Sequence, residues 1–338
     1  MKKTILTGLR PTGNLHLGHY FGAGKTWATI QDDYNFYLEI ADVQALTDNF
    51  DNPQKVRDHT FEITKDLLSI GIDPNKVHFF IQSQIPEIAE LTVFYSNLVT
   101  VSRLQRNPTV KTEIAQKKEL FGNHGESITY GFLGYPVSQA ADITCFKGEV
   151  VPVGDDQLPL LEQCREIVRK FNSIYGEILI EPEQVLSESS RVKGLDGNEK
   201  MGKSLGNAIY LVDTPEQIQQ KVMKAVTDPK KIGKDDPADP NVCMVYYYHQ
   251  LVNSKENIEK ICAECKKGER GCVQCKKELI DALNIFLTPI REKRKYYDEH
   301  PEEVKEILKR GTSEAREKAK ETMQEVRKAM KIDYERED

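Results

Sequence analysis

The 338-residue sequence lacks a run of about 20 apolar residues, the length that a helix needs to cross a bilayer. It also lacks an apolar leader, because the opening KKTIL is soon interrupted by glycines, Arg10 and Pro11. Internal repeats and low-complexity segments are missing as well. These absences exclude a membrane-spanning or repeat protein, and we expect a cytoplasmic protein with no membrane partner.

An excess of positive charge is missing too, because 53 Asp and Glu outnumber 47 Lys and Arg and give a formal net charge of −6. This balance argues against a general nucleic-acid coat protein but leaves local RNA contact open. Short basic clusters occur at 229–234, 265–277 and 291–295, where a solvated face is the simplest interpretation. The chain is long enough for two domains of ordinary size.

Cysteine is scarce in the first half of the chain, where only Cys145 and Cys164 occur, while five more gather between 243 and 275. An odd total of seven without a secretory leader argues against a disulfide framework. Four of the five follow the pattern C-x2-C-x6-C-x2-C, which suits the thiolate ligands of a metal, although the middle interval is short for a zinc ribbon.

Apolar runs alternate with helical patterns through the first half of the chain. The patterns predict strands at 4–8, 34–42 and 77–83, and helices at 17–32, at 52–73 and from Ile85 onward. Such repetition is typical of a doubly wound α/β fold with a parallel sheet. Residues 184–208 show little periodicity and predict a junction, beyond which the pattern is almost purely helical.

The segment TGLRPTGNLHLGHYFGAGKTW, residues 7–27, is rich in glycine and points to a phosphate-bearing ligand. A P-loop would need a glycine five positions before Gly24, and that position holds His19. Lys25 would also lie well inside the next helix. We therefore reject the P-loop, and what remains is the pair His16 and His19 at the start of that helix.

The sequence His16-Leu17-Gly18-His19 resembles the HIGH element of class I aminoacyl-tRNA synthetases. The resemblance implies adenylation, in which negative charge builds on the oxygens of an α-phosphate. A helix N-terminus and two imidazoles can donate hydrogen bonds to those oxygens, and Gly18 leaves room for adenine. Small nucleotidyltransferases carry this element too, so a small-molecule adenylyltransferase stays open at this point.

A second segment, NEKMGKSLGN at 198–207, resembles the KMSKS loop of the same enzymes, and we call it the lysine segment. Lys200 and Lys203 would hold the β- and γ-phosphates and follow the leaving pyrophosphate, and Ser204 would add a hydroxyl donor. Gly202 stands where the family usually has serine, which puts the closing equilibrium of the loop in question. The two motifs together favour a synthetase.

Nearly the whole chain resembles bacterial tryptophanyl-tRNA synthetases, in elements such as LTGLRPTGNLHLGHY, IADVQALTDN, GYPVSQAADI, VPVGDDQ and AVTDP. The resemblance implies a Rossmann-like catalytic domain over residues 1–208 that includes the lysine segment. It also implies a helical anticodon-binding domain over 209–338, a homodimer, and Mg²⁺ bound together with ATP.

Asp142, in GYPVSQAADI, is the residue that would select the amino acid. In the tryptophan family this carboxylate accepts the indole N–H, and indole offers one donor and no acceptor. A phenol usually wants a second polar partner, and tyrosyl-tRNA synthetases are the close competitor. Gln139, one turn earlier, could serve either ring.

The resemblance assigns the remaining contacts of the two small substrates. Tyr135 and Gln157 would bind the α-ammonium of the amino acid, with Val153 beside it. Gly154 and Asp156 would approach the ribose of ATP, because an acid after a strand suits ribose hydroxyls. Gly18, His19, Arg10, Thr12 and Lys111 complete the expected ATP site.

The cysteines resemble a pattern found in a subgroup of these synthetases, where four of them bind a [4Fe-4S] cluster. The matching residues here are Cys243, Cys265, Cys272 and Cys275, with Cys262 as a possible substitute. The first interval is 21 residues, one short of that pattern. We expect the cluster, with Zn²⁺ as the alternative.

The predicted function is that of a tryptophan–tRNA ligase. L-tryptophan and ATP would form tryptophanyl-adenylate and pyrophosphate, and the tryptophanyl group would then pass to tRNA(Trp). The alternatives are a tyrosine–tRNA ligase and a non-catalytic paralogue that binds tRNA or metal. Gly202 is the only hint of the latter.

Overall fold

A computed structural model describes residues 2–122, 127–186, 192–197, 201–202 and 205–334 of the chain. Within them lies a parallel sheet of five strands in the order β3-β2-β1-β4-β5. The strands are β1 (Thr4–Leu9), β2 (Asn35–Ile40), β3 (Val77–Ile81), β4 (Val150–Val153) and β5 (Glu183–Leu186). The chain builds outward from β1 to β3 and then returns to the other side of β1, so the predicted doubly wound sheet is confirmed.

Alternate residues of the strands face opposite sides of the sheet, and helices cover both sides. Ile5 belongs to a buried cluster with Ile63 of α4 (Pro53–Ser69), whereas its neighbour Leu6 joins a cluster with Val137 of α9 (Tyr130–Cys145). The other helices of this part are α3 (Asp42–Ala45), α5 (Pro86–Ser96), α6 (Val101–Arg106), α7 (Pro108–Gln116), α8 (Lys118–Phe121) and α10 (Leu158–Tyr175).

The helix predicted at 17–32 forms as α1 (Leu17–His19), a π-helical turn (Tyr20–Gly24) and α2 (Lys25–Ile30). The predicted strands at 4–8, 34–42 and 77–83 are found as β1, β2 and β3. The predicted junction at 184–208 is wrong at its start, because β5 lies there. β5 is a short edge strand without clear alternation, and its pairing with β4 rather than its own sequence determines it.

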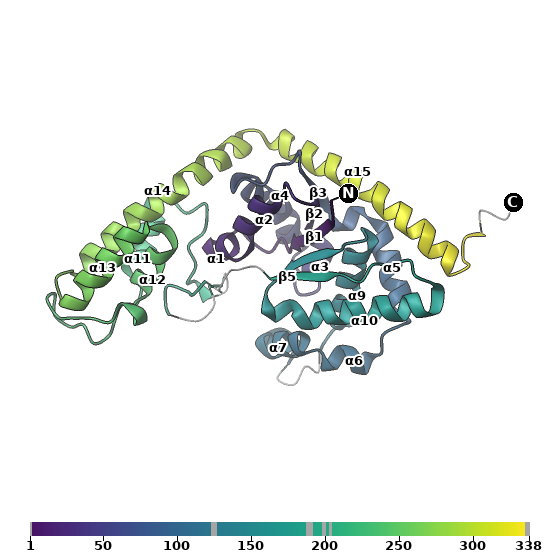
Figure 1. The fold of residues 1–338 in the computed structure, drawn as a ribbon, viewed down its shortest axis with the longest axis horizontal. Coiled ribbons are helices and arrows are strands. Elements are labelled where there is room, and N and C mark those ends of the chain that lie inside the picture. Colours follow the sequence, from purple (N-terminus) through teal and green to yellow (C-terminus); the bar gives the residue numbers. More distant parts are fainter. Residues whose placement is uncertain (1, 123–126, 187–191, 198–200, 203–204, 335–338) are drawn as a thin grey trace.

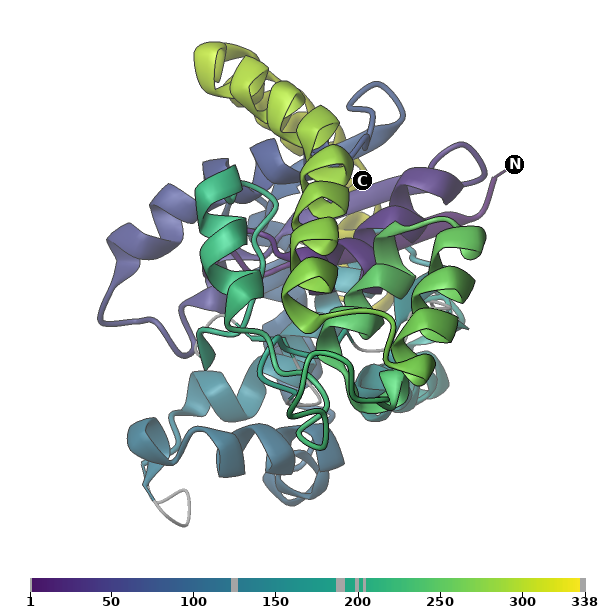
Figure 2. The same cartoon turned by 90° about the vertical axis from the view of Figure 1, so that its left-hand side faces the viewer.

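The helices after residue 209 form a unit around one long helix, except for the last of them. They are α11 (Pro215–Met223), α12 (Met244–Val252), α13 (Lys255–Lys267), α14 (Cys272–Glu299) and α15 (Pro301–Ala329). Figure 2 shows α14 between α11 and α12, both of which it contacts. None of the helices in the described part of the chain is long and apolar enough to span a bilayer.

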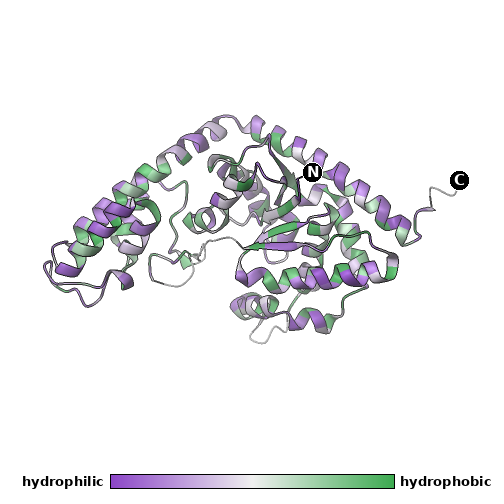
Figure 3. Ribbon diagram, viewed as in Figure 1, coloured by the Kyte–Doolittle hydropathy of each residue, from purple (hydrophilic) through white to green (hydrophobic). Residues whose placement is uncertain are grey.

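The last helix, α15, leaves this unit and lies along the sheet (Figure 1). It covers the edge strand β3, where Thr312 Oγ1 accepts a hydrogen bond from Ile81 N at 3.2 Å. Gly311 permits the close approach, since a Cβ there would lie 2.2 Å from Phe79 O. Both α14 and α15 alternate hydrophilic and hydrophobic residues along their length, as Figure 3 shows. The division into domains at 208 stays a prediction.

A buried ion pair joins the helical unit to the sheet. Arg294 of α14 pairs with Asp66 of α4, and both side chains are less than one-tenth exposed. Asp66 Oδ2 also accepts a hydrogen bond from Leu15 N at 2.8 Å. Burial raises the pKa of Asp66 even though Arg294 opposes the shift. Arg294 also pairs with Glu62 and Asp298, so its guanidinium group lies among three carboxyl groups.

We predict that Arg294→Met lowers the free energy of unfolding by about 3–5 kcal/mol, because it leaves Asp66 buried without its cation. Lys305→Met is the control, since Lys305 pairs with Glu302 on the surface and should cost less than about 1 kcal/mol. Urea unfolding followed by circular dichroism measures both. Equal small losses in the two variants would contradict the anchoring role of Arg294.

Candidate active site

The two histidines of the first motif lie against each other at the start of α1. Their ring centroids are 3.8 Å apart, and His16 is buried. His16 N donates a hydrogen bond to His19 Nδ1 at 3.1 Å. Because Nδ1 accepts, the neutral His19 ring carries its hydrogen on Nε2, which makes Nε2 the donor of that ring.

Gly18 is required by the packing of His16. A Cβ at position 18 would lie 2.8 Å from both Cε1 and Nδ1 of His16, and 3.6 Å from Cβ of Met201. The His16 ring is held between His19 and Tyr210, so it cannot easily move aside. The absence of a side chain at position 18, which the sequence analysis assigned to adenine, is therefore also needed to accommodate the His16 ring.

The lysine segment is attached directly to the first motif. Leu17 N donates to Ile209 O at 2.9 Å, and Leu211 N donates to Leu15 O at 3.0 Å. Met201, inside the segment, is buried in the same core as Leu17. Lys200, Lys203 and Ser204 lie outside the described residues. The described residues on either side bring the two motifs together, as the predicted adenylation site requires.

Asn207, the last residue of the lysine segment, is hydrogen-bonded to one residue inside the segment and to one before it. Its Oδ1 accepts from Gly202 N at 3.0 Å, and its Nδ2 donates to Asp196 Oδ1 at 2.9 Å. The space around Gly202 does not require glycine. An added Cβ would lie 3.4 Å from its nearest neighbour, Leu205 Cδ1, which is an ordinary van der Waals contact. The serine of the family pattern would fit at this position.

Three predicted amino-acid contacts lie on one face of α9, at positions 135, 139 and 142. Asp142 is 1% exposed and accepts a hydrogen bond from Gln82 Nε2 at 2.9 Å. Gln139 Oε1 is buried and finds no donor among the described residues. Burial raises the pKa of Tyr135, so its hydroxyl stays protonated and able to donate.

The sequence analysis missed Glu39, which lies beside Asp142. Glu39 is 4% exposed near the end of β2, and its carboxyl shares a hydrogen bond with that of Asp142. Burial, and then the charge of Asp142, raise the pKa of Glu39 well above its ordinary value, and burial raises the pKa of Asp142 to about 7. The only sequence signal was one acid within the apolar run YNFYLEIAD.

The predicted ribose contacts follow β4 at the point where the order of strands reverses. Val153 ends the strand, Gly154 follows it, and Asp156 and Gln157 form a 3-10 turn (Asp155–Gln157). Thr109 Oγ1 donates to Asp156 O at 2.7 Å and so attaches α7 to this turn. The helix α7 carries Lys111, which is exposed.

Arg10 is positioned by an acid that the sequence analysis did not single out. Arg10 Nη1 lies 3.1 Å from Asp48 Oδ2, and Lys117 pairs with the same carboxylate. Burial would raise the pKa of Asp48, but the two cations outweigh it and lower that pKa. Thr12 N donates to Arg10 O at 2.9 Å, which orders the loop between β1 and α1.

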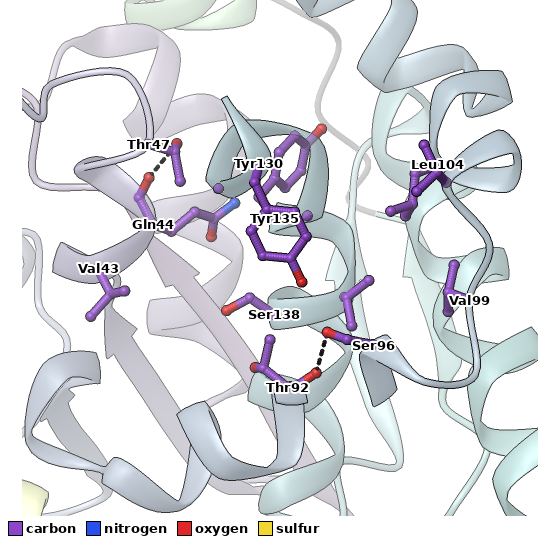
Figure 4. Close-up of a pocket in the computed structure, with 14 residues that line it drawn as sticks. Val43, Gln44, Thr47, Thr92, Ser96, Val99, Leu104, Tyr130, Tyr135 and Ser138 are labelled. Carbon is purple, nitrogen blue, oxygen red and sulfur yellow. Dashed lines mark hydrogen bonds between the residues drawn. The ribbon is translucent and has the colours of Figure 1, made fainter. Parts of the chain in front are cut away.

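An apolar pocket of about 230 Å³ opens beside Tyr135, between α3, α5, α6 and α9 (Figure 4). Val43, Val101 and Tyr130 line it and are 45%, 58% and 77% exposed. We call these three side chains the apolar patch. Exposed apolar clusters of this kind often mark contacts with another protein.

The predicted metal centre has no support in the structure. Among the described residues, no group of three or more His, Cys, Asp or Glu side chains could hold a metal ion. Burial raises the pKa of Cys275 to about 12, and it also raises the pKa values of Cys243 and Cys265. Without a bound metal ion, these thiols are therefore protonated at neutral pH. Cys275 Sγ lies 3.5 Å from His249 Nε2.

The doubly wound sheet, the histidine pair at the start of its first helix and the pairing of residues 15–17 with 209–211 are the features expected of a class I aminoacyl-tRNA synthetase. A family model described as class I tRNA synthetases for W and Y matches residues 2–288. The chain belongs to this family.

Curated relatives match over their whole length. The chain is 50% identical over 339 positions to a tryptophan–tRNA ligase of Clostridium longisporum, covering 98% of each chain. It is 48% identical to one of Streptococcus mutans, covering 98% of this chain and 99% of the relative.

Solved structures agree with this assignment. A Campylobacter jejuni tryptophanyl-tRNA synthetase complexed with ADP and tryptophan superposes with a TM-score of 0.87 at 32% identity, covering 97% of this chain and 99% of that one. A Mycoplasma pneumoniae synthetase for the same amino acid gives a TM-score of 0.82 at 25% identity, covering all of both chains.

We predict that Gly18→Ala lowers the free energy of unfolding by about 1–3 kcal/mol, because its methyl group overlaps the buried His16 ring. Gly22→Ala is the matched control on the same helix, where an added Cβ would meet nothing within 4 Å. It should leave stability unchanged or raise it by up to about 1 kcal/mol. Thermal unfolding of both proteins measures the difference, and equal effects would show that the crowding at position 18 is irrelevant.

Proposed function

We propose that the chain is a tryptophan–tRNA ligase, which activates L-tryptophan with ATP and transfers the tryptophanyl group to tRNA(Trp). The observation that carries this proposal is the direct pairing of residues 15–17 with 209–211, which supports a shared site for the histidine motif and the lysine segment that ends at residue 207. Relatives of this name at 48–50% identity over their full length support the same reaction.

In the activation step, a carboxylate oxygen of tryptophan attacks the α-phosphorus of ATP. A new P–O bond forms, and the bond to pyrophosphate breaks. His16 and His19 at the start of α1 donate hydrogen bonds to the oxygens where charge develops, with His19 acting through Nε2. Lys200, Lys203 and Ser204 hold the departing pyrophosphate. Mg²⁺ bound together with ATP would neutralise part of the charge on the phosphates.

The remaining contacts hold the two reactants in line, which is the main source of rate in such a reaction. Asp142 accepts the indole N–H, while Tyr135 and Gln157 bind the α-ammonium. Gln139 and Val153 complete the amino-acid pocket. On the nucleotide, Gly154 and Asp156 approach the ribose, Gly18 lies against adenine, and Arg10, Thr12 and Lys111 reach the phosphates.

The partners beyond the two small substrates follow from the same proposal. The helical unit of α11 to α14 would bind the anticodon arm of tRNA(Trp). The apolar patch supports a homodimer, since a second copy would cover Val101 and Tyr130, which are more than half exposed. The enzyme would work in the cytoplasm, where its tRNA is.

We also propose a [4Fe-4S] cluster held by Cys243, Cys265, Cys272 and Cys275, with Zn²⁺ as the alternative metal. After burial, neighbouring thiols are among the causes that raise the pKa values of these cysteines: Cys272 acts on Cys243, and both act on Cys265. These thiols are therefore close enough to influence one another. A cluster is larger than one ion, so its ligands stand farther apart than a single-ion site requires.

We predict that ATP–pyrophosphate exchange depends on tryptophan and on no other common amino acid. His19→Ala and Lys203→Ala should lower kcat by at least about 100-fold while changing the KM for tryptophan by less than about threefold, because these groups act on the transition state. Exchange with tyrosine would overturn the specificity. Equal losses in kcat and affinity would contradict the proposed roles.

For the cysteines, we predict that anaerobically purified protein is brown, absorbs broadly near about 400 nm and contains about four irons per chain. Cys265→Ser should abolish the colour. Cys145→Ser should not, because Cys145 is a buried cysteine at the end of α9 that is not among the proposed ligands. Colourless protein with one zinc per chain would replace the cluster by the alternative, and metal-free protein would overturn both.

A further inference from the structure

Asp142 lies at the centre of a small polar network in an otherwise apolar part of the molecule. Glu39 reaches it from β2, and Gln82 reaches it from the turn after β3. All three side chains are less than one-tenth exposed. Because buried polar groups are costly unless their hydrogen bonds are satisfied, the direction of each hydrogen bond is informative here.

The backbone fixes the direction of the first hydrogen bond. Gln44 N donates to one end of the Gln82 amide at 3.0 Å, and that end must be Oε1 because a backbone N–H can only donate. The other end, Nε2, therefore points at Asp142 Oδ1, 2.9 Å away. Gln82 is a donor to Asp142 and cannot exchange the two roles.

The second hydrogen bond needs a proton between two acids. Asp142 Oδ2 and Glu39 Oε1 are buried and have no N–H or O–H donor in the described part of the chain, yet the two carboxyls are within hydrogen-bond reach of each other. Asp142 accepts a hydrogen bond from Gln82, whereas no donor among the described residues reaches Glu39 Oε1, so Glu39 is the group that keeps the proton. It therefore donates to Asp142, which carries the negative charge.

We propose that Glu39, in its protonated form, is a positioning residue that together with Gln82 makes Asp142 a pure acceptor for the amino-acid side chain. This inference rests on the proposed function, which places the indole beside Asp142. A carboxylate has room for a third donor after Gln82 and Glu39, and the indole N–H supplies it.

The same arrangement explains how a tyrosine side chain is refused. A phenol can donate its O–H to Asp142, but its own oxygen then needs a donor. The Glu39 proton and the Nε2 group of Gln82 are both directed at Asp142, so neither of them can donate to the phenol oxygen. Leaving a buried acceptor unpaired is a strong basis for discrimination.

Glu39 is closely surrounded by its neighbours in the sheet. Gly8 is its neighbour on β1, and a Cβ there would lie 2.8 Å from both Cβ and O of Glu39. Phe80 is its neighbour on β3. Asp42, at the start of α3, adds a negative charge that favours the protonated form of Glu39, and Cys145 of α9 lies within the field of both acids.

The test compares Glu39→Leu with Glu39→Gln in tryptophan-dependent ATP–pyrophosphate exchange. The leucine variant has no donor for Asp142, so the KM for tryptophan should rise at least about tenfold while kcat changes by less than about threefold. Its preference for tryptophan over tyrosine in kcat/KM should fall by a similar factor. The glutamine variant keeps a donor, and its KM at neutral pH should stay within about threefold of wild type.

The pH profile separates positioning from mere packing. In the wild type, the KM for tryptophan should fall as pH rises through about 7, because Asp142 becomes ionised. It should rise again at higher pH, when Glu39 loses its proton and repels Asp142. In Glu39→Gln the rise at high pH should disappear, because the amide has no proton to lose.

Glu87→Gln is the matched control. Glu87 is a buried glutamate on α5 that pairs with Arg316 and takes no part in the Asp142 network. Its variant should therefore keep the wild-type KM and pH profile. The wild type could show tryptophan-dependent exchange while both Glu39 variants keep the wild-type KM, selectivity and pH profile. That result would overturn this inference alone. Absence of tryptophan-dependent exchange in the wild type would overturn the proposed function and the inference with it.

Discussion

The carboxylate of Asp66 determines where the two motifs of the site meet. It accepts the N–H of Leu15, the residue before His16, and it pairs with Arg294 of the long helix α14. The strand-like pairing of residues 15–17 with 209–211 completes the connection. The buried ion pair therefore connects α14 to the residue that precedes the histidine motif. This links the part of the molecule proposed to bind tRNA to the part proposed to bind ATP.

A second constraint acts inside the sheet. The order of strands reverses at β1, and the ends of β2 and β4 on either side of it carry the groups proposed to surround the substrates. Glu39 lies on the face of the sheet that α9 covers, because it is two residues after Tyr37, which packs in the same buried cluster as Val137 of α9. Two buried acids at this distance cannot both be ionised at low cost, so one of them keeps a proton. The resulting single charge suits a ligand that offers one donor.

The fold class and the histidine motif could be predicted because both are local patterns in the sequence. Strand–helix alternation gave the sheet, and His16 to His19 lie within one turn of the predicted helix. Glu39 could not be found in this way, because a single acid in an apolar strand acquires meaning only from Asp142, far along the chain. Asp48 was missed for the same reason, since its cations Arg10 and Lys117 come from two other segments. The amphipathic pattern of α15 predicted a helix but not its partner, the edge of β3.

The central claim is that the histidine motif, the lysine segment and the Asp142 network form one site. A crystal structure of the chain with a non-hydrolysable analogue of tryptophanyl-adenylate tests it most directly. The account predicts the indole nitrogen within hydrogen-bond distance of Asp142, and the phosphate analogue at the start of α1 near His19 Nε2. An analogue bound with its indole away from Asp142, or with its phosphate group away from the two histidines, would contradict the account.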